Sequence, residues 1–393
     1  MDTVVIKIYK PAKFRISNFS QFQPEFKKRT FEELSVTERS STRSHLQRFT
    51  LRPKWQERYL PRVEILETLS KDRQSLLYIL KIEFSVPKLL YGNSLLETKE
   101  SDSQKVFSTL SHILKSLDIE VNTTDIENAT VTTVHVCKNL FLPSDIRMRE
   151  LIDEMARMDI NKAFDVSDRQ HKKGTRVLNF HSGTIDWSIY DKISDSLRPR
   201  NKRTDKNHIS QEREIVMAYG LQDHEVFRYE YRIKKGQTVK REINKTMKRE
   251  PKTKVIFKDL FTPNLMKIIV LNSWSLLFKR PENQLLLFRN TNKLELFMHL
   301  LSENKKNETK AHSLNNTLAL YGLTTAIQDF GAKEVRGAIF NIWNKDHPER
   351  LTKTIKLASD LVKNLPHKSN LDFIDSGLKK FEHITITTLE TTL

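Results

Sequence analysis

The chain has 393 residues, of which 38% are hydrophobic and 30% charged, so it is long enough for roughly two or three folded domains and too apolar to be wholly disordered. Lys and Arg outnumber Asp and Glu by 67 to 49, and the resulting formal charge of +18 predicts a polyanionic partner. Nucleic acid is the commonest such partner, because neutralised phosphates release condensed counterions. An anionic membrane surface is the alternative, but the most apolar stretch, residues 261–278, is interrupted by polar residues and does not span a bilayer.

Cysteine usage and the first residues indicate the compartment. The single cysteine, Cys137, excludes a disulfide framework and any zinc site with several cysteines. The opening MDTVVIKIYK alternates like a strand and lacks the layout of a signal peptide. Together these features predict a cytoplasmic protein.

The first half of the chain mixes strands and helices. Strands are predicted at residues 4–9, 76–86 and 132–137, where apolar residues alternate with polar ones. Helices are predicted at residues 104–117 and 144–158 from helical spacing of their apolar residues.

The second half begins with more strands and ends in helices. A hairpin is predicted from residue 176 to residue 192, a basic connection at 198–210, and a strand at 225–235. Helical periodicity dominates residues 255–365, where a segment around Gly331 fits either a helix-turn-helix or an ordinary helical hairpin. DNA binding and dimerisation both remain open for this helical part.

These elements predict an α+β fold, with a mainly antiparallel sheet and flanking helices followed by a helical C-terminal domain. The expected boundaries are residues 1–250 for a catalytic domain, 255–365 for the helical domain and 366–393 for a tail.

The strand at 225–235 carries the most chemical information. Period-two alternation places four charged side chains on the face opposite its apolar residues: Arg228, Glu230, Arg232 and Lys234. One interpretation is a metal-binding carboxylate among phosphate-binding arginines, and the other is a solvated strand with ion pairs to its neighbours. Lys81, Glu83 and Ser85 repeat the arrangement on the strand at 76–86, which favours the first.

A tyrosine and a lysine form a second candidate element. Tyr190 and Lys192 are two residues apart in a predicted strand, so we expect them on one face with Ser188. A phenol with an ordinary pKa of about 10 attacks a phosphodiester only after losing its proton, and a nearby ammonium or divalent ion eases that loss. Because tyrosine beside lysine is common in strands, a purely structural pair is the alternative.

Two basic stretches extend the positive charge. From Arg232 to Lys254 there are ten Lys or Arg and two Glu, and residues 198–206 form another cluster. They are either solvated loops or a track for phosphates, and the net charge favours the track. We expect DNA contacts from the following residues: Lys81, Arg198, Arg200, Arg228, Arg232, Lys234 and Lys235.

Several of these segments also resemble a known family. The run IEFSVPKLLYGN at residues 82–93 resembles the signature of phage and plasmid replication proteins of the filamentous-phage gene II/X type. So do the opening Asp2-Thr3-Val4, the element at 189–192 and the strand at 227–232. These proteins are akin to the Rep_trans class of rolling-circle initiators, and the similarity runs from the start of the chain to about residue 245.

The resemblance implies an enzyme that nicks one strand of a DNA origin in a bacterial host cell, stays attached to the 5′ phosphate through tyrosine, and later rejoins the ends. It implies that Tyr190 is the nucleophile and that Lys192 stabilises phosphate charge or assists proton transfer. It further implies that Glu83 and Glu230 hold Mg²⁺ or Mn²⁺, with Glu64 as a third candidate. Tyr190, Glu83 and Glu230 should then converge in one basic groove.

One departure from better-known initiators bears on the chemistry. No two of the 12 histidines are two residues apart, so the His-hydrophobe-His metal motif is missing and carboxylate ligands are favoured. The sequence also lacks a phosphate-binding loop for ATP, so unwinding of single- and double-stranded origin DNA would need a separate host helicase. The alternatives are an origin- or RNA-binding protein without catalysis, in which Tyr190 packs or stacks on a base, and a basic structural scaffold.

Overall fold

The computed structural model describes residues 1–9, 13–25, 28, 46–51, 59–69, 75–158, 165–170, 176–198, 211–278, 280–286, 292–306, 314–342, 348–362, 365 and 369–392. The chain divides into two compact units. The first comprises residues 1–139, 183–269 and 382–393, and the second comprises residues 140–182 and 270–381. None of the helices within the described ranges is long and apolar enough to cross a membrane.

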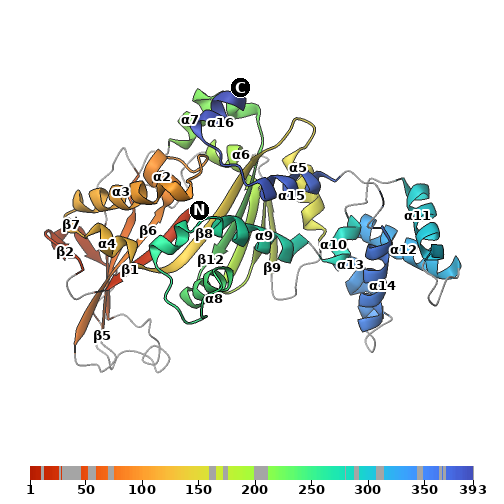
Figure 1. The fold of residues 1–393 in the computed structure, drawn as a ribbon, viewed down its shortest axis with the longest axis horizontal. Coiled ribbons are helices and arrows are strands. Elements are labelled where there is room, and N and C mark those ends of the chain that lie inside the picture. Colours follow the sequence, from red (N-terminus) through yellow and green to blue (C-terminus); the bar gives the residue numbers. More distant parts are fainter. Residues whose placement is uncertain are drawn as a thin grey trace. The chain divides into compact units, whose positions relative to one another are not determined.

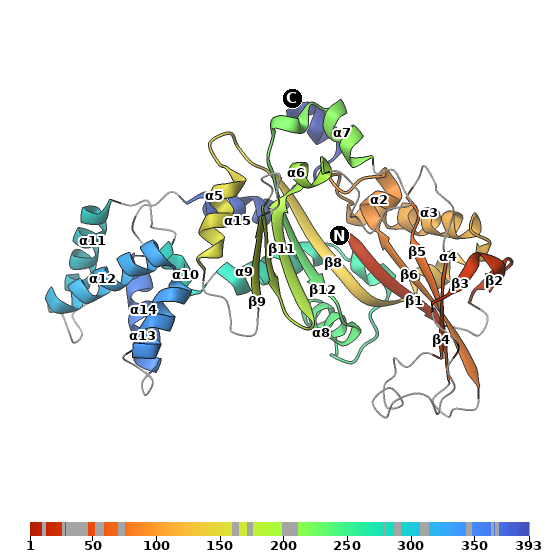
Figure 2. The ribbon, with the colours of Figure 1, turned by 180° about the vertical axis from the view of Figure 1, so that it is seen from behind.

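The first unit is built on a mainly antiparallel sheet, as Figures 1 and 2 show. Its described strands follow the order β3-β4-β5-β6-β1-β8-β12-β11. Their bounds are β1 Thr3–Tyr9, β3 Phe22–Pro24, β4 Gln47–Leu51, β5 Arg62–Leu69, β6 Leu76–Ser85, β8 Thr130–Phe141, β11 Ile185–Asp191 and β12 Val226–Ile233. A separate antiparallel pair joins β2 (Arg15–Ile16) to β7 (Ile119–Glu120).

One face of this sheet forms the core. Leu80, Ile82 and Phe84 of β6 are at most 1% exposed and lie opposite buried apolar residues of β1. Helix α3 (Ser103–Lys115) and the 3-10 helix η4 (Phe257–Phe261) cover this face, because the Phe257 ring lies 5.6 Å from Phe84 and 5.2 Å from Phe107 between centroids. The predicted alternation of β6 is therefore confirmed, and its polar side chains point to the opposite face.

Helix α8 (Gly236–Thr246) was not predicted, because its sequence reads as a basic, polar stretch. Only Val239 and Ile243, one helical turn apart, give it an apolar stripe, and both are fully buried. Figure 1 shows α8 in front of the strands of the first unit, and in the reverse view of Figure 2 it lies behind them. It therefore covers one face of the sheet only.

The second unit contains an antiparallel strand pair and helices. Strands β9 (Asp165–Gln170) and β10 (Arg176–His181) pair with each other, and α5 (Met148–Ala156) contacts β10. The helices of this unit are α10 Pro281–Leu286, α11 Lys293–Lys306, α12 Leu314–Phe330, α13 Ala332–Ile342, α14 Pro348–Val362 and α15 Asn370–Lys380, together with most of α9 Leu265–Phe278. The predicted α+β class, with helices in the C-terminal region, is confirmed.

The units do not follow the predicted boundaries. Residues 140–182 fall in the second unit, and residues 382–393 of the expected tail fall in the first. The tail segment is held there because the carboxylate of Glu97 accepts hydrogen bonds from the Ile384 amide and from Lys138, whose ammonium also bonds the Glu382 carbonyl. The pattern within one segment of sequence does not show that a distant C-terminal segment packs against the first unit.

Gly331 joins α12 to α13 and provides a test of the second unit. Its φ of +95° is rarely adopted by other residues, and an added Cβ would lie 3.0 Å from the Arg157 carbonyl oxygen. We expect Gly331→Ala to lower the free energy of unfolding by about 2 kcal/mol, measured by urea titration. Gly337→Ala, where an added Cβ meets nothing within 4 Å, is the matched control and should stabilise α13 by about 0.5–1 kcal/mol. Equal effects of the two substitutions would contradict the assigned backbone strain.

Candidate active site on the polar sheet face

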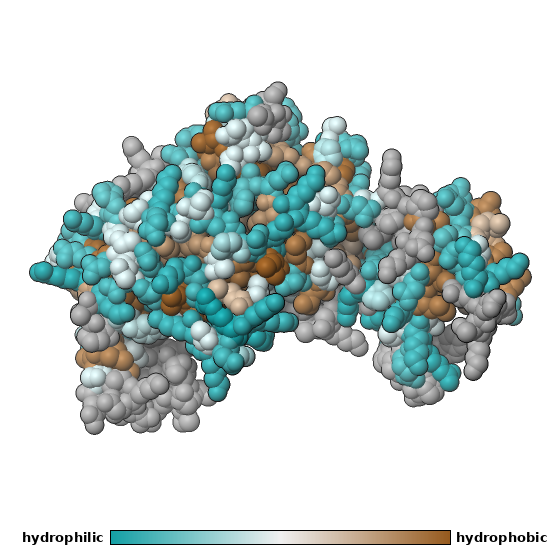
Figure 3. Space-filling view, in the orientation of Figure 1, coloured by the Kyte–Doolittle hydropathy of each residue, from teal (hydrophilic) through white to brown (hydrophobic). Residues whose placement is uncertain are grey.

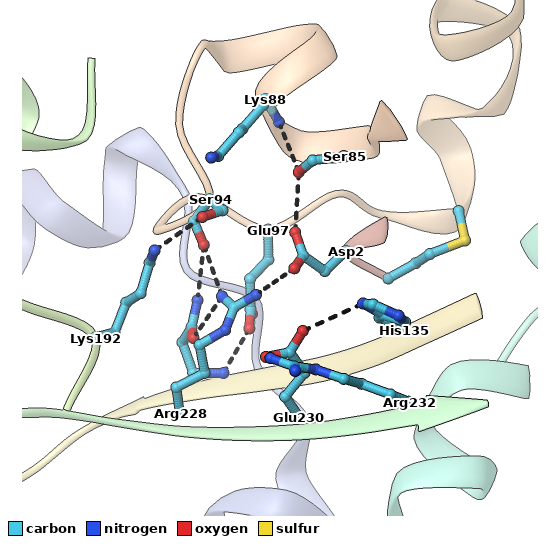
Figure 4. Close-up of polar contacts among 12 residues, drawn as sticks. Asp2, Ser85, Lys88, Ser94, Glu97, His135, Lys192, Arg228, Glu230 and Arg232 are labelled. Atoms are coloured by element: carbon cyan, nitrogen blue, oxygen red, sulfur yellow. Dashed lines mark hydrogen bonds and ion pairs between the residues drawn. The ribbon is translucent and has the colours of Figure 1, made fainter. Parts of the chain in front are cut away.

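The polar face of β12 is buried where it carries Arg228 and Glu230, and Figure 4 shows these side chains with their polar neighbours. The two side chains are 1% and 3% exposed, whereas Arg232 is half-exposed. The apolar residues of β12 lie on the opposite face and are buried as well. The alternation predicted for this strand is confirmed, but its charged face is an enclosed cluster rather than a solvated surface.

Glu230 lies at the centre of the cluster. Its carboxylate accepts a hydrogen bond from the Tyr190 hydroxyl at 3.4 Å and pairs with Arg232 at 2.8 Å and with Nδ1 of His135 at 3.5 Å. Burial raises the pKa of Glu230, but Arg232, the His135 hydrogen bond and Arg228 outweigh burial and hold this pKa well below its usual range. Glu230 is therefore an ionised carboxylate beside a phenol.

Tyr190 is the half-buried partner of Arg228 in the pairing of β11 with β12. Burial raises the pKa of its phenol well above the usual value, and the carboxylate of Glu230 adds to the shift, while Arg228 opposes it. The resting side chain is a neutral phenol, so a positive charge supplied with the substrate is needed to ionise it.

Arg228 is held by the protein rather than exposed to DNA. Its guanidinium pairs with Asp2 at 2.7 Å and donates to the Ser94 carbonyl at 2.9 Å and to the Asn139 side chain at 3.2 Å. Asp2 in turn accepts a hydrogen bond of 2.9 Å from the Ser85 hydroxyl, which caps helix α2 (Val86–Tyr91). The expectation that Arg228 contacts DNA is not supported by this position, and a role in positioning Asp2 and Tyr190 fits it better.

The expectation that Lys192 belongs to the strand of Tyr190 is corrected by the structure, although Figure 4 shows its side chain pointing to the same side as Arg228. Strand β11 ends at Asp191, whose carboxylate caps helix α6 (Lys192–Ser196), so period-two alternation stops before Lys192. Its ammonium is buried and bonds the Ser94 hydroxyl at 2.8 Å and Glu212 of α7 (Glu212–Ala218) at 3.0 Å. Since the Ser94 carbonyl binds Arg228, Lys192 touches the site through Ser94.

Removing Lys192 should therefore affect stability first. Lys192→Met leaves the buried carboxylate of Glu212 with Lys88, at 3.9 Å, as a more distant ion-pair partner, and we expect the free energy of unfolding to fall by about 3–5 kcal/mol. The double variant Lys192→Met/Glu212→Gln removes both charges and should recover most of the loss in a urea titration. A double variant that is stable yet cannot cleave DNA would show instead that Lys192 acts on the phosphate.

The other predicted carboxylates lie farther along the sheet. Glu83 of β6 pairs with Val5 of β1, and Val5 pairs with Thr133 of β8. His135, two residues after Thr133 and so on the same face, contacts Glu230, which puts Glu83 and Glu230 on one side of the sheet. Three strand spacings separate β6 from β12, which is about 14 Å. Glu64 lies one strand beyond Glu83 and is already paired with Arg62 and Lys81, each at 2.9 Å. The structure therefore brings Tyr190 and Glu230 together but leaves Glu83 and Glu64 apart from them.

The remaining predicted DNA contacts are dispersed. Lys81 pairs with Glu64, Lys234 pairs with Asp186 at 2.8 Å, and Arg198 pairs with Asp195 at 3.6 Å. Lys235 is half-exposed, and Arg200 lies outside the described residues. Arg232, at the edge of the cluster, is best placed to meet a phosphate at Tyr190.

Three residues of the site were given no role by the sequence: His135, Ser94 and Glu212. Asp2 appeared there only as part of a resembling segment. His135 alternates with apolar residues in a predicted strand, which was the available signal, but the choice of Glu230 as its partner depends on the order of strands. Ser94 and Glu212 lie in segments whose sequence gives no sign of contact with the sheet.

A divalent ion at this site would need ligands from the substrate as well as from the protein. Within the described ranges, no group of three or more His, Cys, Asp or Glu side chains is arranged to hold a metal. Glu230 and His135 offer one oxygen ligand and one nitrogen ligand side by side. Mg²⁺ and similar ions are often bound by one or two protein ligands, with water and substrate phosphate supplying the others.

The acidity of Glu230 gives a test of the cluster. Because its pKa is lower in the folded than in the unfolded state, its contribution to stability is complete above the ordinary carboxyl pKa and is lost as the pH falls toward the folded value. We therefore expect the difference in unfolding free energy between the parent and Glu230→Gln to be constant near neutral pH and to shrink below about pH 4.5. A difference that is independent of pH would show that Glu230 is not ionised.

The fold and the site together define a strongly basic α+β protein with a phenol and an ionised carboxylate on one face of an antiparallel sheet. Residues 40–250 match the family model for the N-terminal part of a phage replication-associated protein, the gene II protein. The chain thus belongs to this family of phage replication initiators, of the filamentous-phage gene II type, as its resemblance implied. The match ends close to the predicted residue 245 but starts after β1. No curated protein and no solved structure matches the chain.

Proposed function

We propose that the protein initiates rolling-circle replication by nicking one strand of an origin and holding the 5′ phosphate on Tyr190. The observation that carries the proposal is the Tyr190 hydroxyl bonded to the ionised Glu230, next to Arg228 and Arg232, in a chain of this family. A protein that binds an origin or RNA without cutting it needs no buried carboxylate to orient a phenol.

In the proposed reaction, the Tyr190 oxygen attacks the phosphorus of the scissile phosphodiester and the bond from phosphorus to the 3′ oxygen breaks. Glu230 accepts the phenolic hydrogen bond and so points the oxygen's remaining lone pairs at the phosphate. Because the pKa of Glu230 is low, it orients the phenol, and the proton passes to solvent as the new bond forms. The departing 3′ oxygen takes a proton from water, and reversal of these steps rejoins the strand without a nucleotide cofactor.

Two arginines support this step in different ways. Arg232, half-exposed and bound to Glu230, is placed to pair with a non-bridging phosphate oxygen. Arg228 is buried next to Tyr190 and opposes the rise in the phenol's pKa. Mg²⁺ or Mn²⁺ on Glu230 and His135 would neutralise phosphate charge. The proposal includes a separate host helicase for unwinding.

The proposal is tested with a 5′-labelled and a 3′-labelled single-stranded oligonucleotide that contains the element's own origin, incubated with the protein and Mn²⁺. The expected result is a free 5′-labelled fragment that ends in a 3′ hydroxyl, and a 3′-labelled fragment whose 5′ phosphate is linked to the protein. This link survives denaturation, and protease digestion releases the fragment. Cleavage without a protein-linked fragment would assign the attack to water. Tight binding without cleavage would favour the non-catalytic alternative.

A further inference from the structure

Helix α8 lies against the sheet face opposite Tyr190 and Glu230. Trp187 and Tyr231, with ring centroids 5.2 Å apart, belong to the apolar faces of β11 and β12. Thr132 of β8 alternates with Thr133 and so lies on this face. An added Cβ at Gly236, the first residue of α8, would be 3.8 Å from the Thr132 Cα, so α8 packs here. Period-two alternation puts Tyr190 and Glu230 on the other face. A ligand on the outer side of α8 is therefore separated from the phenol by the sheet.

The outer side of α8 is positively charged. It forms, with three neighbouring lysines, what we call the α8 surface: Lys13, Lys240, Arg241, Lys245, Lys248 and Lys254. All six side chains are exposed or half-exposed. Arg241 and Lys245 lie one turn apart, about 6 Å along the helix, and Lys248 follows just beyond its C-terminal end. Figure 3, in the orientation of Figure 1, shows hydrophilic side chains over the region of α8.

The protein does little to neutralise these charges. Arg241 pairs with its neighbour Glu242, and Lys13 pairs with Asp125 at 3.5 Å. No acidic side chain in the described part of the chain pairs with Lys240, Lys245 or Lys248. Burial lowers the pKa of Lys254, and repulsion from Lys13 and Lys240 lowers it further. Like charges one turn apart on a helix cost about 0.2–0.5 kcal/mol per pair, which an external polyanion would recover.

The composition of the surface favours a duplex over a single strand. Proteins that hold single strands stack bases on aromatic side chains, and residues 236–254 contain no Phe, Tyr or Trp. A row of lysines on a helix is instead suited to the phosphates of a double helix, which it contacts without reading bases.

We propose that the α8 surface binds the phosphate backbone of double-stranded DNA next to the origin, independently of sequence, while Tyr190 acts on the strand across the sheet. This inference rests on the proposed function for its setting, because a nick in a duplex origin is made between double-stranded flanks.

The test is the triple variant Lys240→Gln/Lys245→Gln/Lys248→Gln, with Lys305→Gln/Lys353→Gln/Lys356→Gln as a control of equal charge. Fluorescence anisotropy measures binding of a 30-base-pair duplex of unrelated sequence at several salt concentrations. We expect the α8 variant to bind at least about tenfold more weakly and its salt slope to fall by roughly 2–3, since each lost phosphate contact removes about 0.9. The control should match the parent, and urea unfolding should show the α8 variant to be no less stable.

Two outcomes would overturn the inference: duplex binding that survives the α8 substitutions, or weakened binding of phosphatidylserine-containing vesicles with duplex binding unchanged. A short single-stranded origin oligonucleotide separates this inference from the proposed function. If the parent fails to cleave it while the α8 variant still loses duplex binding, the nicking proposal falls and the α8 surface stands.

Discussion

Replacing Tyr190 with phenylalanine should abolish the protein-linked DNA fragment and lower the nicking rate by about 10³-fold or more, because the proposed phosphotyrosine bond forms on the Tyr190 oxygen. The substitution removes one oxygen from a half-buried ring and one 3.4 Å hydrogen bond to Glu230, so folding should be almost unaffected. Nicking of supercoiled origin plasmid with Mn²⁺ measures the loss, and binding of the same plasmid should match that of the parent.

Tyr231 supplies the matched control. It is the neighbour of Glu230 in sequence, but its ring lies on the opposite face against Trp187, and it is buried. Tyr231→Phe removes a hydroxyl without touching the candidate site and should nick like the parent. If Tyr190→Phe still forms the covalent fragment, the nucleophile lies elsewhere and the polar cluster has only a structural role.

Sequence patterns predicted those features of the fold that depend only on residues close together in the sequence. The alternation in β6 and β12 identifies which side chains share a face, and that alone places Glu230 away from the core. It also places Glu83 on the same side of the sheet. What alternation cannot give is the order of strands, and the order puts β1 and β8 between β6 and β12. Glu83 was therefore assigned to the right face but was wrongly expected beside Glu230, since their strands are about 14 Å apart.

The errors at Lys192 and α8 have a different cause. At Lys192, the carboxylate of Asp191 caps a helix and ends the strand one residue before the lysine. Side-chain capping here replaces the hydrogen bonds between strands, and the spacing of residues in the sequence does not reveal this. In α8, tertiary burial of Val239 and Ile243 stabilises a helix that its own like charges disfavour. His135 and Asp2 join the site through strand neighbours distant in sequence, so neither was given a role by the sequence, although Asp2 belongs to a resembling segment.

Glu230→Gln and Glu83→Gln together should show which carboxylate serves the reaction. Glu230→Gln keeps the shape of the side chain but removes the charge that His135, Arg232 and Arg228 share, so we expect nicking to fall by about 10²-fold or more. It should also lower the free energy of unfolding by about 3 kcal/mol, because the buried guanidinium of Arg228 loses part of the negative charge that offsets its own. Glu83→Gln alters a half-buried carboxylate on the same sheet face and should nick at a rate close to the parent's.

The two effects of Glu230→Gln must be separated, because a partly unfolded enzyme is also slow. Nicking is therefore measured at a temperature where urea titration shows both variants fully folded, and oligonucleotide binding is measured alongside. Retained binding with lost cleavage assigns Glu230 to the chemical step, since the phenol then lacks the acceptor that orients it. If Glu83→Gln is instead the inactive variant, the reacting phosphate must lie over β6, beyond the reach of the Tyr190 hydroxyl, and the cluster around Glu230 would serve the fold alone.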